Sequence, residues 1–381
     1  MSKKKLIILV ENIFSIRDYN RFCIKDLEKH FDVKVIDFTY YFKKEYFKKY
    51  FKLYSYKNYY KYIFIVKKKK DFDKIQESIN VYQEYLILDH AFSENYNNKN
   101  LFNLKKFFHK KKNINLIYFS SGPLPLQFYV FYYLKIKNFF LLYLRKFFLR
   151  NIIYYNYLIS SGKLSYDYGL YYKKNYPMHS LDFDKYLMEN KLNILPEIKY
   201  KKYAVFIDDM MGDSPDVLYH NVKNTYDYDA YCKLLKNFFL DFRKKNDLKI
   251  VFASHPKRKN FGKIKEFKIF DDYILDKTLN IVKFSKLVFI HWSTCISFAI
   301  IFKKPVVHLN SKIINYNKKI SKMQNDTGGL LVDLDDISTW DINLKKIDFN
   351  KYKPYRDNYL KHPLSKNKTF VETLLDLSLK K

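Results

Sequence analysis

Short apolar runs alternate with amphipathic stretches along most of the chain. Leu6–Val10 is a continuous apolar run of the kind that forms a buried parallel strand. Ser15–His30 carries apolar residues near helical spacing, and Val33–Phe38 is a second apolar run. A strand, a helix and a strand in this order make a βαβ unit, so the pattern predicts an α/β domain with a parallel sheet.

The pattern repeats through the rest of the first half. We expect a helix over Tyr40–Tyr62 and one or two helices over Phe128–Arg150, both of them segments dense in Lys, Tyr and Phe. Further strands are predicted at Tyr62–Val66, Tyr85–Asp89, Leu116–Ser120 and Tyr154–Ser160.

A second α/β series follows a linker that we place at Asn193–Tyr200, which contains Pro196. Its strands are predicted at Tyr203–Ile207, Lys249–Ala253, Lys268–Phe270, Leu287–His291 and Val306–Leu309. Its helices, and those that follow it, are predicted at Tyr228–Lys245, Thr278–Phe284, Thr294–Phe302, Asp336–Lys346 and Phe370–Leu379. The predicted fold class is α/β, with two Rossmann-like domains facing a central cleft. The predicted bounds are residues 1–192 for the N-terminal domain, 193–350 for the C-terminal domain and 351–381 for a helical tail.

Composition narrows the class of protein. The chain of 381 residues carries 71 Lys and Arg against 39 Asp and Glu, a net charge of +32, and is 48% hydrophobic. That apolar content excludes a disordered chain. The charge favours an anionic partner, whether a phosphorylated substrate, a phospholipid or a nucleic acid. Abundant Lys, Tyr and Phe with only 7 Gly also fit the bias of an AT-rich genome.

Cysteine usage and hydropathy bear on the compartment. Cys23, Cys232 and Cys295 are too far apart for a zinc motif and odd in number, which favours a reducing cytoplasm. The first apolar run stops at Glu11, too early for a signal peptide, and we predict no membrane-spanning helix.

The first group of candidate site residues follows the strand Lys249–Ala253. In open α/β sheets, the loops at the carboxyl ends of the strands bind ligands. An imidazole there can donate a hydrogen bond to a phosphate, and an arginine can hold an anion with two hydrogen bonds. The candidate nucleotide-binding residues are therefore His255, Pro256, Lys257 and Arg258. The alternative is that His255 only caps a strand end.

The second group follows the strand Leu287–His291. Ser293 is placed as the N-cap of a short apolar helix, with Thr294 in its first turn. Hydroxyl groups and free backbone N–H groups at such a turn can hold a phosphate without a metal. We therefore add His291, Ser293 and Thr294 to the candidate nucleotide-binding residues. The alternatives are plain capping and a buried His291 that contacts no ligand.

The candidate catalytic residues are two adjacent carboxylates, Asp208 and Asp209, directly after the strand Tyr203–Ile207. A carboxylate there can take the proton of an acceptor hydroxyl, and a like-charged neighbour raises its pKa toward the useful range. The sequence does not separate the two residues, and the alternative is a turn or N-cap aspartate.

Other charged patterns carry less chemistry. Asp-x-Asp pairs, which bind a divalent cation in metal-dependent transferases, are typical of turns in a chain of this composition, so we predict no metal and no cofactor. These pairs are Asp71/Asp73, Asp182/Asp184, Asp227/Asp229 and Asp333/Asp335. The aromatic and basic segments Tyr40–Tyr62 and Phe128–Arg150 suit an anionic membrane surface, with single-stranded nucleic acid or an ordinary core as alternatives.

Three short motifs carry a family resemblance: Ser254-His255-Pro256, Ser293-Thr294 and Lys304-Pro305-Val306-Val307. They resemble the nucleotide half of bacterial surface-polysaccharide glycosyltransferases of the GT-B type, in particular CMP-sugar users such as sialyltransferases and Kdo transferases. The resemblance implies that His255-Pro256 and Ser293-Thr294 bind CMP and that an acidic pair followed by Gly supplies the base. Here Asp208-Asp209 precede Gly212 by two Met residues and open the second half, whereas sialyltransferases carry this motif in the first half.

The resemblance implies a cytoplasmic glycosyltransferase that is peripheral at the inner face of the plasma membrane. It would move a nonulosonate or Kdo from a CMP donor to a glycan or lipid-linked glycan acceptor, independently of metal. The N-terminal domain would bind the acceptor and the C-terminal domain the nucleotide sugar. One alternative is a polyol-phosphate transferase of the same layout that uses CDP-glycerol. Two others are a basic nucleic-acid-binding protein, which lacks a recognised motif, and a non-catalytic scaffold.

Overall fold

The computed structural model describes residues 3–54, 61–91, 98–120, 124, 154–165, 170–190, 198–210, 227–258, 262–314 and 317–380. The chain divides into two compact units. The first unit consists of residues 1–123, 128–181 and 362–381, and the second of residues 124–127 and 182–361. Some of the sequence predictions fall outside the described residues, namely the helix over Phe128–Arg150 and the linker up to residue 197.

The first unit is a Rossmann-like parallel sheet. In the described part of the chain it has seven strands, in the order β3-β2-β1-β4-β5-β6-β7. The strand bounds are β1 Lys4–Val10, β2 Phe31–Asp37, β3 Ile63–Ile65, β4 Tyr85–His90, β5 Ile114–Ser120, β6 Tyr154–Ser160 and β7 Tyr171–Pro177. The chain crosses from one side of β1 to the other between β3 and β4, which is the switch in strand order typical of this fold.

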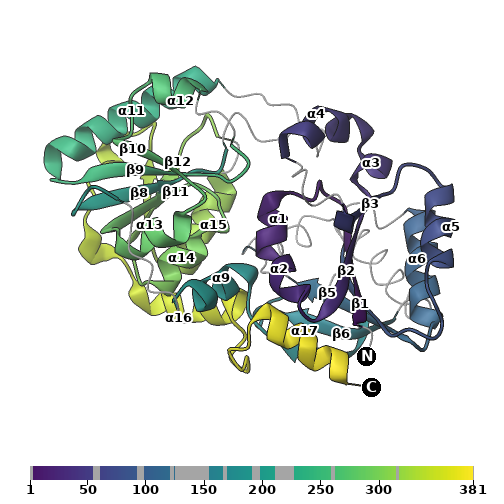
Figure 1. Ribbon diagram of the computed structural model, residues 1–381. Helices are drawn as coiled ribbons and strands as arrows, with labels where there is room; N and C mark the ends of the chain where they lie inside the picture. Colours follow the sequence, from purple (N-terminus) through teal and green to yellow (C-terminus); the bar gives the residue numbers. More distant parts are fainter. Residues whose placement is uncertain are drawn as a thin grey trace, which may run out of the picture. The chain divides into compact units, whose positions relative to one another are not determined.

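Helices cover both faces of this sheet. Their bounds are α1 Ile16–Arg21, α2 Ile24–Leu27, α3 Thr39–Phe42, α4 Lys44–Tyr54, α5 Lys70–Glu77, α6 Lys99–Lys110 and α17 Phe370–Leu379. Alternate residues of β1 point to opposite faces, so Leu6 and Ile8 pack with α1, α2 and α17 while Ile7 and Leu9 pack with α5 and α6. Figure 1 shows α1 and α2 on one side of the strands and α5 and α6 on the other.

The second unit repeats the architecture. Its described strands follow the order β10-β9-β8-β11-β12-β13, all parallel. Their bounds are β8 Tyr203–Ile207, β9 Lys249–Ser254, β10 Asp272–Leu275, β11 Leu287–Ile290, β12 Val306–Asn310 and β13 Leu330–Asp333. The helices are α9 Leu181–Asn190, α11 Tyr228–Lys245, α12 Gly262–Glu266, α13 Thr278–Phe284, α14 Ile296–Ile301, α15 Asn317–Thr327 and α16 Tyr352–Tyr355.

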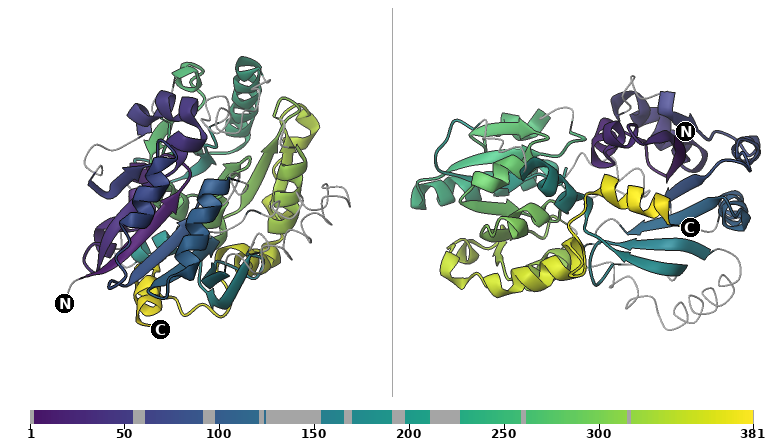
Figure 2. Two further views of the ribbon diagram at one scale, coloured as in Figure 1. Left: turned by 90° about the vertical axis from the view of Figure 1, so that its right-hand side faces the viewer. Right: turned by 60° about the horizontal axis from the view of Figure 1, so that its bottom comes forward.

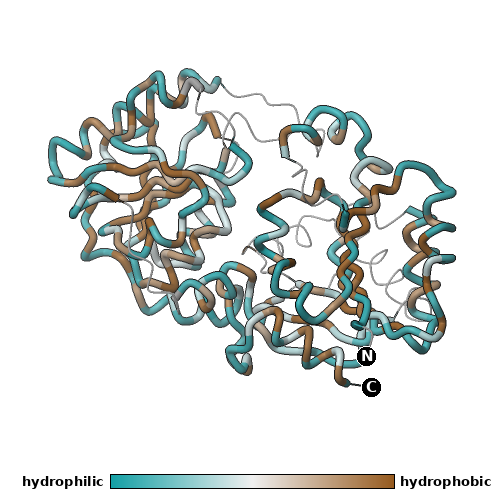
Figure 3. The backbone as a smooth tube through the Cα atoms, in the orientation of Figure 1, coloured by the Kyte–Doolittle hydropathy of each residue, from teal (hydrophilic) through white to brown (hydrophobic). Residues whose placement is uncertain are grey.

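The central strands of the second unit are apolar on both faces. Ala204 and Phe206 of β8 pack against α11, whereas Val205 and Ile207 pack against α13 and α14. Figure 3 shows the hydrophobic positions gathered in the strands of each unit and the hydrophilic ones on its outer turns. A strand buried on both faces has no polar alternation, which is why these runs were readable as strands from the sequence.

The last helix belongs to the first unit. Phe370, Leu374 and Leu377 of α17 are fully buried, and Phe370 stacks on Phe119 of β5 at 5.3 Å between ring centroids. Figure 2 shows α17 lying along the first unit's strands. The compact units therefore differ from the bounds predicted at residues 192 and 350. The first ends at Leu181, and residues 362–381 return to it because α17 carries an apolar face.

Several predicted elements are confirmed with their bounds, namely Tyr154–Ser160, Tyr203–Ile207, Tyr228–Lys245, Thr278–Phe284 and Phe370–Leu379. Others are wrong for local reasons. The helix predicted over Ser15–His30 breaks at Cys23, whose φ is +52°. The strand predicted at Lys268–Phe270 lies instead at Asp272–Leu275.

Short turns capped by polar side chains replace the helix that we predicted at Asp336–Lys346. Asp336–Lys346 forms two short 3-10 turns, Ile337–Thr339 and Leu344–Lys346, because the side chains of Asp336 and Asn343 each cap one turn. The elements that were not predicted include the strands β7 and β13 and the helices α5, α6, α9, α12, α15 and α16.

The aromatic and basic segment Tyr40–Tyr62 forms α3 and α4 over its described part. Tyr46, Phe47 and Tyr54 of α4 are buried, so core packing accounts for part of this pattern. No helix among the described residues is long and apolar enough to cross a membrane. Attachment to a membrane surface stays a prediction.

We expect that Phe370→Ala destabilises the first unit by about 3–5 kcal/mol, because it removes a fully buried ring from the core. Denaturant unfolding followed by circular dichroism checks this value. The control is Leu379→Ala in the same helix, whose side chain is 77% exposed and whose loss we expect to cost under about 0.5 kcal/mol. Equal effects of the two substitutions would contradict this packing.

Candidate functional site

The candidate site residues follow three neighbouring strands of the second unit. Strand register pairs Ile207 of β8 with Ala253 of β9 on one side and with Ile290 of β11 on the other. The residues that follow these strands therefore lie along one edge of the sheet. Strand order switches direction at β8, and in open α/β sheets the loops at this point form the ligand site.

Asp208 and Arg258 form a buried ion pair in this edge. The side chains are only 3% and 2% exposed. Arg258 donates two hydrogen bonds to the carboxylate, from Nε to Oδ2 at 2.6 Å and from Nη2 to Oδ1 at 3.0 Å. The backbone N–H groups of His255 and Met210 also donate to Asp208, at 3.1 and 2.8 Å. These four hydrogen bonds engage both carboxylate oxygens of Asp208.

This pair changes the roles expected of both residues. Arg258 does clamp an anion in bidentate fashion, but the anion is the carboxylate of Asp208 rather than a ligand. Asp208 in turn accepts hydrogen bonds from three residues of its own unit, so its oxygens are not presented to an acceptor hydroxyl. We therefore assign Asp208 and Arg258 a positioning role in the interpretation that follows.

The residues between β9 and Arg258 form a tight turn that orients His255. The backbone N–H of Arg258 donates to the carbonyl of His255 at 2.9 Å, and the N–H of Lys257 donates to Nδ1 of His255 at 3.1 Å. Pro256 fixes one backbone angle of this turn. Because Nδ1 accepts a hydrogen bond, the neutral ring carries its proton on Nε2, which makes Nε2 the donor of the imidazole. The ring is half-buried.

His291 has a different place from the expected one. It is fully buried, with Nδ1 donating to the carbonyl of Leu309 at 2.6 Å and Nε2 accepting from the hydroxyl of Tyr231 at 2.7 Å. Burial lowers the pKa of His291 to about 4, so the ring is neutral near pH 7. Both nitrogens are hydrogen-bonded within the unit, and the ring therefore anchors the loop after β11.

Ser293 and Thr294 lie in the turn between β11 and α14. The hydroxyl of Ser293 accepts a hydrogen bond from the N–H of Cys295 at 3.3 Å, and the carbonyl of Thr294 accepts from the N–H of Ser297. The helix begins at Ile296, two residues later than we predicted, with Cys295 as its N-cap. Ser293 and Thr294 are both half-buried. The single strand β8 separates this turn from the His255 turn, a spacing of about 10 Å between the outer strands.

Two polar partners of this turn were not found from the sequence. Tyr231 of α11 is fully buried and hydrogen-bonds His291. The hydroxyl of Ser297 in α14 lies within hydrogen-bond distance of two acceptors, the carbonyl of Thr294 at 2.6 Å and the carboxylate of Asp182 at 2.9 Å. Tyr231 lies on the apolar face of a helix and Ser297 within an apolar run, so the pattern alone marks them only as core. Their roles depend on contacts with residues far away in the sequence.

Asp209 is half-buried beside this hydrogen-bonded group. Burial raises the pKa of Tyr231 well above its usual value, and the negative charge of Asp209 adds to that effect. Tyr231 is therefore a neutral hydroxyl near pH 7, and the carboxylate of Asp209 lies close enough to influence it. Asp209 is the member of the acidic pair that remains a candidate base.

Members of three of the four Asp-x-Asp pairs accept hydrogen bonds in turns or caps, whereas Asp182 of the fourth is hydrogen-bonded by Ser297. Asp227 caps α11, Asp71 accepts hydrogen bonds from two backbone N–H groups, and Asp333 accepts one from the N–H of Asp335. Among the described residues, no group of three or more His, Cys, Asp or Glu side chains lies close enough to hold a metal ion. The contacts of Asp71, Asp227 and Asp333 fit the turn interpretation of their pairs.

Comparison with known proteins gives the fold. No protein-family model matches this sequence, and no curated protein matches it. Among solved structures, the wall teichoic acid polymerase TagF matches with a TM-score of 0.50 and 14% identity, covering 99% of this chain and 89% of that chain. The UDP-GlcNAc 2-epimerase of Methanocaldococcus jannaschii matches with a TM-score of 0.48 and 14% identity, covering 99% of this chain and 100% of that chain. MurG of Acinetobacter baumannii matches with a TM-score of 0.47 and 6% identity, again covering 99% of this chain and 100% of that chain.

At these identities the likeness concerns the fold alone. The similarity to the polymerase spans nearly the whole chain, and each unit of this protein has the Rossmann strand order. The predicted fold class, α/β with two Rossmann-like domains of the GT-B type, is confirmed. The comparisons do not select a CMP-sugar donor.

The buried ion pair gives a first prediction for this site. Asp208→Asn leaves the charge of Arg258 buried and uncompensated, so we expect a loss of about 3–5 kcal/mol of stability in the second unit. Both tryptophans of the chain, Trp292 and Trp340, belong to this unit, and their fluorescence during denaturant unfolding measures the change. The control is Asp241→Asn, which breaks an exposed pair with Lys245 and should cost under about 1 kcal/mol.

His291 gives a second prediction, on pH. Its pKa is lowered to about 4 in the folded unit from about 6.5 in the unfolded chain. Between these values the unfolded chain takes up a proton that the folded unit does not, so stability is present above pH 6.5 and falls as the pH drops. We expect His291 alone to contribute a loss of about 3 kcal/mol over this range.

Tryptophan fluorescence at pH 7.5 and pH 4.5 measures this dependence. His291→Asn should reduce the slope of stability against pH by about one proton. Tyr231→Phe is the matched control, because it removes the same hydrogen bond but keeps the titrating ring, so it should lower stability at both pH values and keep the slope. An unchanged slope in His291→Asn would contradict a buried neutral ring.

Proposed function

We propose that this protein is a transferase that uses a cytidine-nucleotide donor, and that the second unit binds the donor. The first choice of donor is a CMP-activated sugar, a nonulosonate or Kdo, transferred to a surface glycan or a lipid-linked glycan. The place proposed for it is the cytoplasmic face of the plasma membrane, where the net charge of +32 would favour anionic lipid headgroups. The proposal needs neither a metal nor a cofactor.

The observation that carries the proposal is the fixed orientation of His255. The buried pair of Asp208 and Arg258 holds the turn, and the N–H of Lys257 holds Nδ1 of the ring. The imidazole is therefore held in one orientation at the carboxyl end of β9, beside the switch in strand order. A donor that is held in place before the ligand arrives loses little entropy on binding, which suits a phosphate oxygen.

The turn after β11 supplies the second set of donors. Ser293 and Thr294 are half-buried in this turn. His291 anchors the start of the same loop through its hydrogen bond to the carbonyl of Leu309. We assign the phosphate of the donor to these hydroxyls and to His255, with Lys257 as a nearby positive charge. Together they would stabilise the negative charge that develops on the leaving CMP.

The reaction follows from this assignment. An acceptor hydroxyl attacks the anomeric carbon of the sugar, the bond between that carbon and the phosphate oxygen breaks, and CMP leaves with the bonding electrons. Asp209 takes the proton of the acceptor hydroxyl, since Asp208 is already paired with Arg258.

A polyol-phosphate transferase is the second candidate, and the similarity in fold to a wall teichoic acid polymerase favours it. In that reaction the acceptor hydroxyl attacks the distal phosphorus of CDP-glycerol, and CMP is again the leaving group. The two candidates therefore share the nucleotide that remains in the site, and they differ in whether carbon or phosphorus is attacked.

A thermal-shift panel of CMP, CDP, UDP and GDP tests the proposal. CMP or CDP at 100 times its dissociation constant should stabilise the second unit by about 2.7 kcal/mol. His255→Ala should abolish this shift, because the oriented donor is lost, whereas His30→Ala, an exposed residue of the first unit, should keep it. If only UDP or GDP raises the melting temperature, the assignment of a cytidine nucleotide is wrong.

Release of CMP from a CMP-sugar or from CDP-glycerol then separates the two candidates. Asp209→Asn should lower kcat by about a hundredfold or more while the CMP shift is kept. Salt-sensitive binding of single-stranded DNA that survives His255→Ala, together with no nucleotide shift, would support the nucleic-acid alternative instead.

A further inference from the structure

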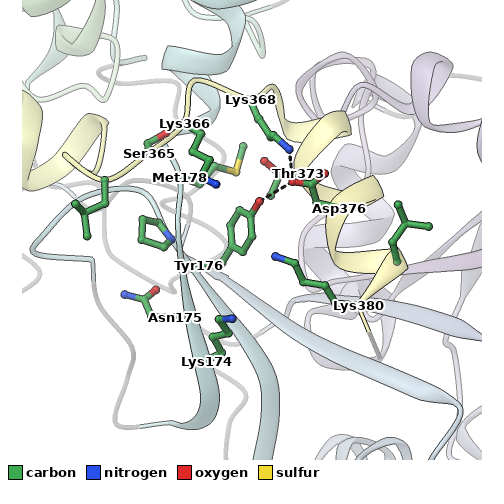
Figure 4. A pocket seen from close by; sticks show the side chains of 13 residues that line it. Lys174, Asn175, Tyr176, Met178, Ser365, Lys366, Lys368, Thr373, Asp376 and Lys380 are labelled. Atoms are coloured by element: carbon green, nitrogen blue, oxygen red, sulfur yellow. Dashed lines mark hydrogen bonds and ion pairs between the residues drawn. The ribbon is translucent and has the colours of Figure 1, made fainter.

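The first unit contains a cavity of about 490 Å³ that the proposed function does not use. It lies between the carboxyl end of β7, the segment that precedes α17, and α17 itself (Figure 4). All of its lining residues belong to the first unit. Its volume falls within the range of small-molecule sites.

The lining of this cavity is strongly basic. Among the described residues it includes the four lysines Lys174, Lys366, Lys368 and Lys380, against the single acidic residue Asp376. Figure 4 shows Lys368 and Tyr176 directed at Asp376, with Lys380 on the same side of the cavity. Four ammonium groups around one carboxylate leave a net positive charge, which favours an anion as occupant.

Asp376 is held by two neighbours. The hydroxyl of Tyr176 donates to its carboxylate at 2.9 Å, and the ammonium group of Lys368 lies 2.5 Å from the same oxygen. The contact with Lys368 lowers the pKa of Asp376, and burial raises the pKa of Tyr176 to about 12. Asp376 is thus a charged acceptor near pH 7, and it competes with any anion for Lys368.

Thr373 provides an independent sign of a ligand. This residue of α17 lines the cavity and is 1% exposed, yet its hydroxyl has no hydrogen-bond partner among the residues that the structure describes. Buried hydroxyl groups are nearly always hydrogen-bonded, and an orphaned one in a cavity wall calls for a partner inside the cavity. Met178 and Leu364 add apolar surface to the wall.

We propose that this cavity is a second ligand site, which binds the phosphoryl group of a phosphorylated small molecule or of a lipid headgroup. A phosphoryl group carries up to two negative charges and several acceptor oxygens, which match several ammonium groups and a hydroxyl donor. The volume and the apolar wall leave room for an attached carbon skeleton. The site lies within the first unit and stands independently of the proposed nucleotide site.

Titration calorimetry of the full chain with inorganic pyrophosphate tests this site. The double variant Lys366→Gln/Lys380→Gln should weaken binding about tenfold, because two ammonium contacts are lost. Lys173→Gln is the control for the loss of a lysine charge in the first unit, since Lys173 lies in β7 but does not line the cavity. It should change the affinity less than about twofold. His255→Ala, in the other unit, should leave this binding intact and so separates it from the nucleotide site.

Two further variants distinguish a binding role from a structural one. Thr373→Val should weaken pyrophosphate binding about fivefold without lowering the melting temperature, because the hydroxyl makes no hydrogen bond with the described residues. Asp376→Asn should tighten binding about threefold, because it removes the competing charge and releases Lys368.

Sedimentation with vesicles identifies the source of the phosphoryl group. Retention on phosphatidylglycerol vesicles that the double lysine variant loses, and Lys173→Gln keeps, indicates a lipid headgroup. If the double lysine variant weakens pyrophosphate binding but does not change retention on vesicles, the ligand is a soluble molecule. If the double variant matches the wild type in both assays, or if Asp376→Asn weakens pyrophosphate binding, the proposed site is wrong.

Discussion

The buried contact between Asp208 and Arg258 is the constraint on which the second unit's site depends. Both side chains are almost completely removed from solvent, and charges are costly in that environment unless they are paired and fully hydrogen-bonded. The contact joins the end of β8 to the turn after β9, two segments fifty residues apart in the sequence. Once it forms, the backbone of His255 is tied to Asp208 and the ring can take only a narrow range of orientations.

A second buried polar contact performs the same task on the other side of β8. His291 joins the carbonyl of Leu309 in β12 to the hydroxyl of Tyr231 in α11, and its neutral ring satisfies both partners. The loop that bears Ser293 therefore begins from a fixed point. The two loops flank the switch in strand order, and each is held by hydrogen bonds between residues of the same unit. Stability and site geometry are linked through these anchors, as expected where polar groups are buried in an apolar sheet.

The last helix shows how one amphipathic segment can serve two purposes. Phe370, Leu374 and Leu377 of α17 lie on one side and complete the core of the first unit. Thr373 and Asp376 lie on the neighbouring side and line the basic cavity beside β7. The apolar side fixes the position of the helix, and this position in turn brings residues from near the end of the chain to the edge strand of the sheet. The cavity exists only because both contributions meet there.

The sequence alone determined the elements whose burial is uniform and the edge of the sheet at which the candidate site residues lie. Continuous apolar runs such as Tyr203–Ile207 and Leu287–Ile290 have no other stable place than a sheet covered on both faces, and polar residues directly after them must lie at its carboxyl edge. For that reason His255, Ser293 and the acidic pair were identifiable as candidates. Exposed strands such as β7, with little apolar content, left no such pattern.

Only the tertiary structure decided what each polar side chain does. Arg258, His291 and Asp208 look like ligand-binding or catalytic groups in a linear sequence, but each is used by a partner that folding brings close. The buried hydroxyl of Thr373 and the cavity around it cannot be predicted from the sequence either, because they arise from the packing of α17 against β7. Hydrophobic periodicity reports which face of an element is buried, whereas hydrogen-bond partners depend on distances between segments that the sequence does not encode locally.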